Sequence, residues 1–178
     1  MAYTTVNKSK EHFDTILYNS GGGGGQTISG MDFQPSMVWT KNRDNASYIH
    51  AIVDQVRGGT KKRFPNATTA ENTDTNAITA WTSDGYTFGS SGSFNYSTNN
   101  YVNWCWKANG AGVSNSDGDI TSTVSANQTS GFSIVKYTGS GTYQNTVGHG
   151  LGAVPTMIIV MSLSFTREPT VYHVGMGN

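Results

Sequence analysis

Apolar and polar positions alternate in short segments through the first half of the chain. Residues 13–18 and 26–28 have a β-rich composition, and the five glycines between them, 21–25, break a helix and suit a hairpin loop. Residues 37–39 form another apolar run, and residues 48–56 alternate between two faces. The pattern therefore predicts strands at short spacing and no helix longer than a turn or two.

The clearest strand covers residues 101–106. Val102, Trp104 and Trp106 occupy alternate positions, so they project from one face of the strand. Because aromatic side chains bury large areas, we expect this face to form the centre of the hydrophobic core.

Turn-forming residues dominate the segment before that strand. Residues 80–82 and 86–88 flank an Asp-Gly pair, which predicts a strand, a turn and a strand. Residues 58–80 hold several poor helix formers and are predicted to be a loop. The basic cluster within it, at 61–63, is accordingly expected to be solvated.

The chain repeats part of itself. Residues 13–21 recur at 132–140, and residues 33–38 recur at 153–158 after one inserted residue. Two shorter matches join residues 26–28 with 145–147 and residues 48–50 with 171–173.

This repeat predicts the domain organisation. We expect an N-terminal arm at residues 1–12 and a single β-sandwich over 13–178. The sandwich would contain one full β unit, 13–110, and the opening strands of a second copy, 132–178.

The apolar run at 157–161 needs cover, because the second copy lacks a counterpart of the strands that would hide it. These strands could complete the sandwich of the first unit, pair with another subunit, or be covered by a continuation of the chain. We favour the first alternative, with contact between subunits close behind. The residues predicted to serve core or assembly are Trp39, Val102, Trp104, Trp106, Ile158 and Val160.

Composition narrows the classes of partner. Charged residues make up only 12% of the chain, and 11 basic residues balance 11 acidic ones, so no field attracts nucleic acid. Cys105 is the one cysteine, which excludes an internal disulfide framework. We also expect no signal peptide and no membrane insertion, because no apolar segment has the required length.

Several phrases resemble one family. They are residues 33–43, 56–58, 83–89, 101–108, 138–139 and 148–152. Together they resemble uncharacterised virion structural proteins of marine tailed phages, including cyanophages and pelagiphages, described as tail-fibre-like or lectin/glucanase-like. The resemblance covers nearly the whole chain and implies a protein made in the host cytoplasm and located in the virion. It carries no catalytic residues over to this sequence.

Candidate chemistry is sparse. The acidic residues lie mostly in turn-like contexts, so we do not expect the two facing carboxylates that a glycosidase needs. We expect that the protein is not an enzyme. Asn115, Asp117 and Asp119 have the spacing of a calcium loop, but Ile120 replaces the expected glycine and a tight turn is the better interpretation. No histidine pair has the spacing of a zinc site. We expect neither a metal nor another cofactor.

Four aromatic residues flank loops rich in Ser, Asn and Thr, where rings next to amides and hydroxyls could hold a sugar. They are Trp81, Tyr86, Tyr96 and Tyr101.

The sequence therefore predicts an all-β protein, an antiparallel sandwich of jelly-roll (concanavalin A-like) type. The resemblance implies that it builds a tail fibre, a tail-associated appendage or a capsid decoration by contact with copies of itself and other virion proteins. The alternative is an adhesin that binds a host surface glycan.

Overall fold

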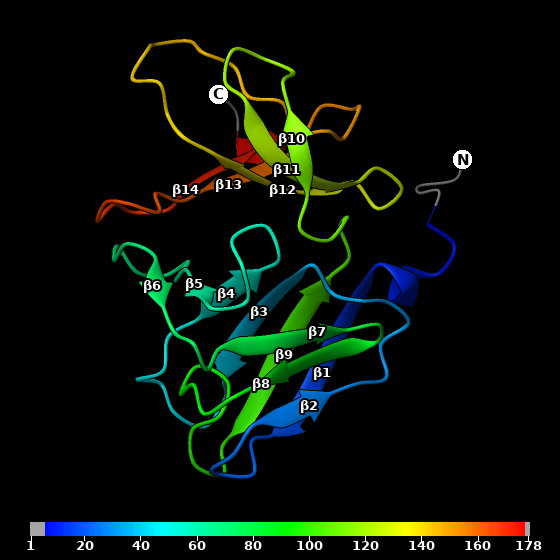
Figure 1. Ribbon diagram of the computed structural model, residues 1–178, viewed down its shortest axis with the longest axis vertical. Coiled ribbons are helices and arrows are strands. Elements are labelled where there is room, and N and C mark those ends of the chain that lie inside the picture. Colours follow the sequence, from blue (N-terminus) through cyan, green and yellow to red (C-terminus); the bar gives the residue numbers. More distant parts are fainter. Residues whose placement is uncertain (1–5, 177–178) are drawn as a thin grey trace.

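Antiparallel strands make up nearly all of the regular structure (Figure 1). The computed structural model describes residues 6–176. Within these residues the helical elements are two short 3-10 turns, η1 (Ser9–Glu11) and η2 (Val174–Met176). The all-β prediction is confirmed. The strands are β1 (Phe13–Asn19), β2 (Gln26–Ile28), β3 (Met37–Asn42), β4 (Ala51–Asp54), β5 (Lys61–Lys62), β6 (Asn72–Thr73), β7 (Ile78–Thr82), β8 (Gly85–Phe88), β9 (Asn100–Trp106), β10 (Val113–Asn115), β11 (Ser122–Asn127), β12 (Phe132–Tyr137), β13 (Met157–Val160) and β14 (Thr170–His173).

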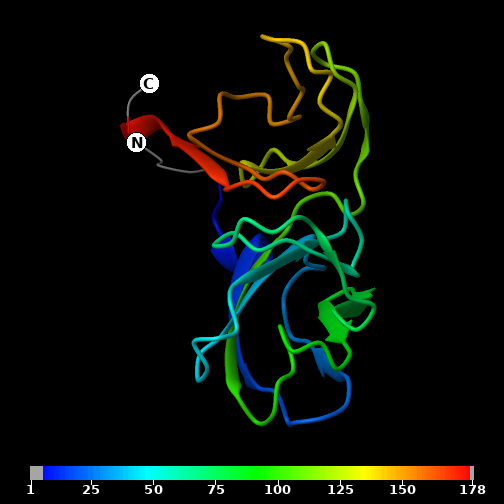
Figure 2. The same cartoon turned by 90° about the vertical axis from the view of Figure 1, so that its left-hand side faces the viewer.

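The lower part of the molecule has two layers, seen side on in Figure 2. One layer is the four-stranded sheet β1-β9-β3-β4 and the other is the three-stranded sheet β2-β8-β7. Buried side chains from both sheets meet in one cluster, among them Val38, Val53 and Cys105 from the first sheet and Ile28 and Phe88 from the second. Apolar burial between these layers holds the lower part together.

The face of β9 that enters the core is the opposite of the one predicted. Tyr101, Asn103 and Cys105 are buried, whereas Trp104 and Trp106 are only partly buried on the outer face. The polar Asn103 is accommodated because its amide donates a hydrogen bond to the buried hydroxyl of Tyr86. The prediction that the tryptophans form the centre of the core is wrong.

The five glycines do not form a hairpin. β1 pairs with β9, while β2 pairs with β8, so residues 20–25 cross from one layer to the other. The predicted turn between β7 and β8 is confirmed, because these strands pair directly. Part of the segment predicted as loop is ordered as β5 and β6, which pair with each other.

The upper part carries its own sheets (Figure 1). β10, β11 and β12 form a three-stranded sheet, and β13 pairs with β14. Of the three ways to cover residues 157–161, completion of the first unit's sandwich is therefore wrong, because β13 joins neither sheet of the lower part.

The repeat is visible in the strands. β12 corresponds to β1, and β13 corresponds to β3. Met37 lies opposite Asp54 in the β3–β4 pair, and Met157 lies opposite His173 in the β13–β14 pair. The register therefore aligns β14 with β4, and the predicted match between residues 48–50 and 171–173 is wrong.

Candidate functional site

Three aromatic rings gather on the outer face of the four-stranded sheet. Trp39 on β3 lies directly opposite Trp104 on β9, with ring centroids 6.3 Å apart and nearly perpendicular planes. The indole N–H of Trp39 donates a hydrogen bond of 2.9 Å to Nδ1 of His50. The His50 ring in turn lies nearly parallel to that of Trp104. We call these three residues the tryptophan face.

The tryptophan face is close to neutral. Burial, helped by the positive charge of Lys41, lowers the pKa of His50, which favours the uncharged ring. The Lys41 ammonium is itself bound to the carbonyl oxygens of Asn42 and Tyr48, at 2.6 and 2.7 Å. Partly buried rings beside neutral polar groups can stack on the apolar face of a sugar.

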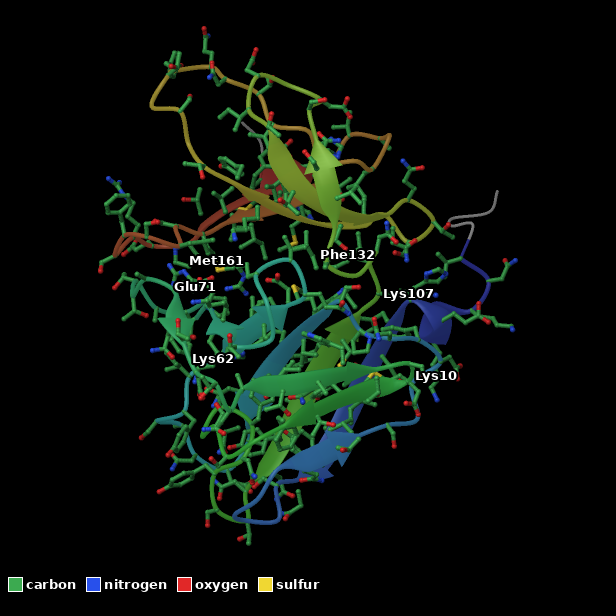
Figure 3. The ribbon with its side chains drawn as sticks, viewed as in Figure 1. Lys10, Lys62, Glu71, Lys107, Phe132 and Met161 are labelled. Atoms are coloured by element: carbon green, nitrogen blue, oxygen red, sulfur yellow. The ribbon has the colours of Figure 1, made fainter. Side chains whose placement is uncertain are left out.

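Aromatic stacking joins the lower and upper parts. The Trp106 ring lies 4.9 Å from that of Phe13 and 5.8 Å from that of Phe132, and the last pair is nearly parallel. Figure 3 shows Phe132 and Met161 between the upper sheets and the lower part. Trp106 thus serves the junction between the two parts.

Arg63 fastens the segment after β13 to the lower part. Its buried guanidinium donates to the carbonyl oxygens of Ser162 and Arg167, at 2.9 and 3.2 Å. Burial, together with the charge of Arg57, lowers the pKa of this group. The basic cluster was predicted to be solvated, which is wrong for Lys62 and Arg63, since both are buried.

The β13–β14 pair has exposed apolar side chains on both faces, and on one of them Met157 and Val171 are 53% and 46% exposed. The other face is formed by the alternate positions. Ile158 lies opposite Tyr172, and Val160 lies opposite Thr170, so these four side chains share a face that we call the open face. Ile158, Val160 and Tyr172 are 43%, 45% and 38% exposed. Ile158 and Val160, predicted to serve core or assembly, therefore lie outside the core of the chain.

The four aromatic residues predicted to hold a sugar do not form one site. Tyr86 and Tyr101 are fully buried, so their expected role at the surface is wrong. Trp81 packs against the core cluster. Tyr96 is exposed and lies against Tyr48, with ring centroids 4.4 Å apart.

The acidic residues are largely engaged in structural contacts. Asp54 and Glu71 both bind Arg57, at 2.6 and 3.1 Å, and Asp74 binds Lys62 at 2.6 Å. These ion pairs link positions between residues 54 and 74, which include much of the segment 58–80 that was predicted as loop.

The calcium-like segment folds as a bend closed by its own side chains. The side-chain oxygen of Asn115 accepts the N–H of Asp117, and the carboxylate of Asp119 accepts the N–H and hydroxyl of Thr146. Those hydrogen bonds lower the pKa of Asp119. Across residues 6–176, no three metal-ligating side chains come together.

Sequence reasoning missed His50, Arg63 and Tyr172. His50 follows no motif, because its partner Trp39 comes from the neighbouring strand. For Tyr172, a corrected register of the repeat would have been the signal, since it places this residue at the position of Val53.

Comparison with known proteins identifies a family but no individual protein that matches the chain. No curated protein and no solved structure shows a significant match to the chain. Within residues 6–176, none of the helical elements has the length and apolar character to cross a membrane. The model of one family matches residues 8–178, and the chain therefore belongs to the family described as a domain of unknown function, DUF7483.

Proposed function

We propose that this protein is a structural component of a phage virion and acts by association rather than catalysis. The observation that carries the proposal is the open face, where apolar side chains of β13 and β14 remain exposed. Contiguous exposed apolar surface is uncommon in proteins that work as monomers and marks sites of interaction. A tail fibre, a tail-associated appendage and a capsid decoration are all consistent with this mode of action.

The surface composition supports the same proposal. Only 12% of the residues are charged, and the two signs balance, so contacts between neighbouring molecules meet little electrostatic repulsion. The phrases that resemble virion structural proteins of marine tailed phages support the proposal that these contacts are made in a virion. We further propose that the two-layered lower part is of jelly-roll (concanavalin A-like) type.

Immunogold labelling tests the location. Antibodies against the chain would be applied to purified particles of a phage that encodes it. Gold at regular positions on tails or capsids is the expected result. Labelling confined to the unassembled fraction of the lysate would overturn the proposal.

A second candidate function is binding of a host surface glycan, and the tryptophan face favours it. Trp39, His50 and Trp104 present rings and a neutral polar group on the outer side of the sheet. A glycan array with the wild-type chain and the Trp104→Ala variant tests this function. Binding that the variant loses would support it, and silence of the wild-type chain on all sugars would reject it.

A further inference from the structure

The hydrogen bond between Trp39 and His50 determines which nitrogen of the His50 ring carries the proton. The indole N–H of Trp39 donates to Nδ1 of His50 at 2.9 Å, so Nδ1 is the acceptor. Burial and the charge of Lys41 lower the pKa of His50, which favours the neutral ring. The single proton of the neutral ring is therefore on Nε2. Among residues 6–176 this nitrogen forms no hydrogen bond, so the tryptophan face offers an oriented N–H donor to a ligand.

A row of side chains crosses three strands beside this donor. Thr15 on β1, Trp104 on β9 and Trp39 on β3 lie directly opposite one another in successive strand pairs. Thr15 is exposed, and Trp104 is partly buried. Because neighbouring strands lie about 4.8 Å apart, the row from Thr15 to Trp39 spans about 10 Å. His50 immediately precedes β4, the next strand of the sheet. In strand order, the Trp104 indole thus lies between the hydroxyl of Thr15 and the N–H of His50.

The charged groups near this row are already paired or face away. The Lys41 ammonium has three N–H donors, and carbonyl oxygens of three neighbouring residues accept them. Asp54, on the same face, is bound to Arg57 at 2.6 Å. Asp14 projects toward the opposite face, because it alternates with Thr15. A charged ligand would find no free counter-charge among these groups, whereas an uncharged ligand needs none.

These features together fit an uncharged sugar. We infer that the tryptophan face binds a neutral pyranose, whose C–H face stacks on Trp104 while its oxygens contact the Nε2–H of His50 and the hydroxyl of Thr15. This inference rests on the glycan-binding function proposed above and names its ligand class. A pyranose has an apolar C–H face and oxygens at its rim, which matches an indole between two polar groups. His50 then sets the specificity, because a site built around a hydrogen-bond donor rejects a ligand that lacks the matching oxygen.

A glycan array tests the ligand class. The probes are immobilised oligosaccharides that end in galactose, glucose, mannose or N-acetylglucosamine, beside matched probes that end in glucuronic acid, N-acetylneuraminic acid or glucosamine. The wild-type chain is expected to bind one or more of the neutral probes and none of the charged ones. A preference for an acidic or an amino sugar would overturn the inference.

Substitutions of His50 test the donor, with the affinity for the preferred neutral probe measured by calorimetry. His50→Phe keeps a flat ring but has no N–H, and it is expected to bind about tenfold more weakly. His50→Gln can accept the Trp39 N–H and also donate to the sugar, so it should keep most of the affinity. His173→Phe is the matched control, because His173 is an exposed histidine on β14. It should bind as the wild type does. Equal affinities of His50→Phe and the wild type would reject the inference.

Thr15→Val is the second variant, for the case that His50→Phe does not fold. It replaces an exposed hydroxyl by a methyl group of similar size, so the midpoint of urea unfolding should stay close to that of the wild type. Its affinity for the same probe should fall about threefold or more. Unchanged binding by Thr15→Val would contradict the proposed position of the sugar.

The inference and the functions on which it builds fail in different ways. Binding that Trp104→Ala abolishes but His50→Phe leaves intact would end the inference and keep glycan binding at the tryptophan face. Silence of the wild-type chain on every probe would reject both of these and leave the virion role, which immunogold labelling tests independently.

Discussion

Asn103 and Tyr86 face each other across the two layers of the lower part, and the amide of Asn103 donates to the hydroxyl of Tyr86. Both residues are fully buried. Burial of a polar group is costly unless the group is hydrogen-bonded, and this contact offsets part of that cost on the inner face of β9, where the side-chain oxygen of Asn103 has no hydrogen-bond partner in the described part of the chain. The same inner face carries Cys105, and the tryptophans of β9 are thereby directed outward.

The Cys105 thiol should report unfolding. Burial, with a smaller contribution from Asp14, raises the pKa of this thiol well above its usual range. Because the thiolate is the reactive form, a disulfide reagent such as DTNB should leave the native chain unmodified and react fully once urea unfolds it. The Leu17→Cys variant, which has an exposed second thiol, is the control. In its native state it should react with one equivalent of DTNB at once. Rapid native labelling of Cys105 would contradict the burial of this face.

Stability should depend on pH through His50. The folded state has the lowered pKa, so on acidification the unfolded chain binds the proton first. Stability is therefore expected to fall as the pH drops below the ordinary histidine value of about 6.5. The decline should stop below the lowered pKa of the folded state.

Urea titrations between pH 5 and 8 measure this effect. His50→Asn keeps an acceptor near the Trp39 indole and removes the titrating group, so its decline in this range should be smaller. If the stability of His50→Asn falls as much as that of the wild type over this pH range, groups other than His50 cause the pH dependence.

Two glycines should respond in opposite directions to alanine. A Cβ at Gly85 would overlap the carbonyl oxygen of Ile28, so Gly85→Ala forces β2 away from β8 and should cost about 1–3 kcal/mol. A Cβ at Gly23 meets no atom, and Gly23→Ala should stabilise the chain by about 0.4–1 kcal/mol, because it restricts the unfolded state. The midpoints of urea unfolding compare the two variants. Equal midpoints would contradict the close approach of β2 and β8.

Removal of Arg63 should loosen the segment after β13. Arg63→Met leaves the carbonyl oxygens of Ser162 and Arg167 without this donor, at a cost of about 1–3 kcal/mol for each one that stays buried. Hydrogen exchange should then accelerate at the amide of Arg167, which donates to the carbonyl of Thr68.

Lys61→Met is the control for that variant. The Lys61 ammonium reaches an exposed hydroxyl, that of Thr73, so its removal should change stability by less than about 0.5 kcal/mol. Unchanged exchange at Arg167 in the Arg63→Met variant would show that other contacts hold the segment.

The alternation of apolar and polar residues predicted the positions of the strands better than it predicted which face of each strand is buried. β1, β3, β8 and β9 lie where the apolar pattern places them. The faces of β9 could not be assigned, because Val102 and Trp104 alternate with Asn103 and Cys105, and an isolated asparagine resembles a surface residue. The partner of the Asn103 amide N–H, the hydroxyl of Tyr86, is contributed by another layer and cannot be read from the sequence of β9.

Sequence reasoning failed mainly where contacts are remote. The pairing of β1 with β9 joins segments separated by β2 to β8, and no local turn signal predicts it. Similarly, Tyr101 was expected beside a surface loop, but its hydroxyl bonds Gly92 and Asn42 inside the fold. The repeat did predict the strand at 157–160, and comparison of its two copies revealed the open face.

Arg63 binds the segment after β13 through main-chain oxygens rather than side chains. Every amino acid offers such an oxygen, so mutations at positions 162 and 167 can accumulate without loosening that attachment, whereas position 63 has no equivalent substitute. The surface that this segment displays is therefore free to diversify while its anchorage stays fixed.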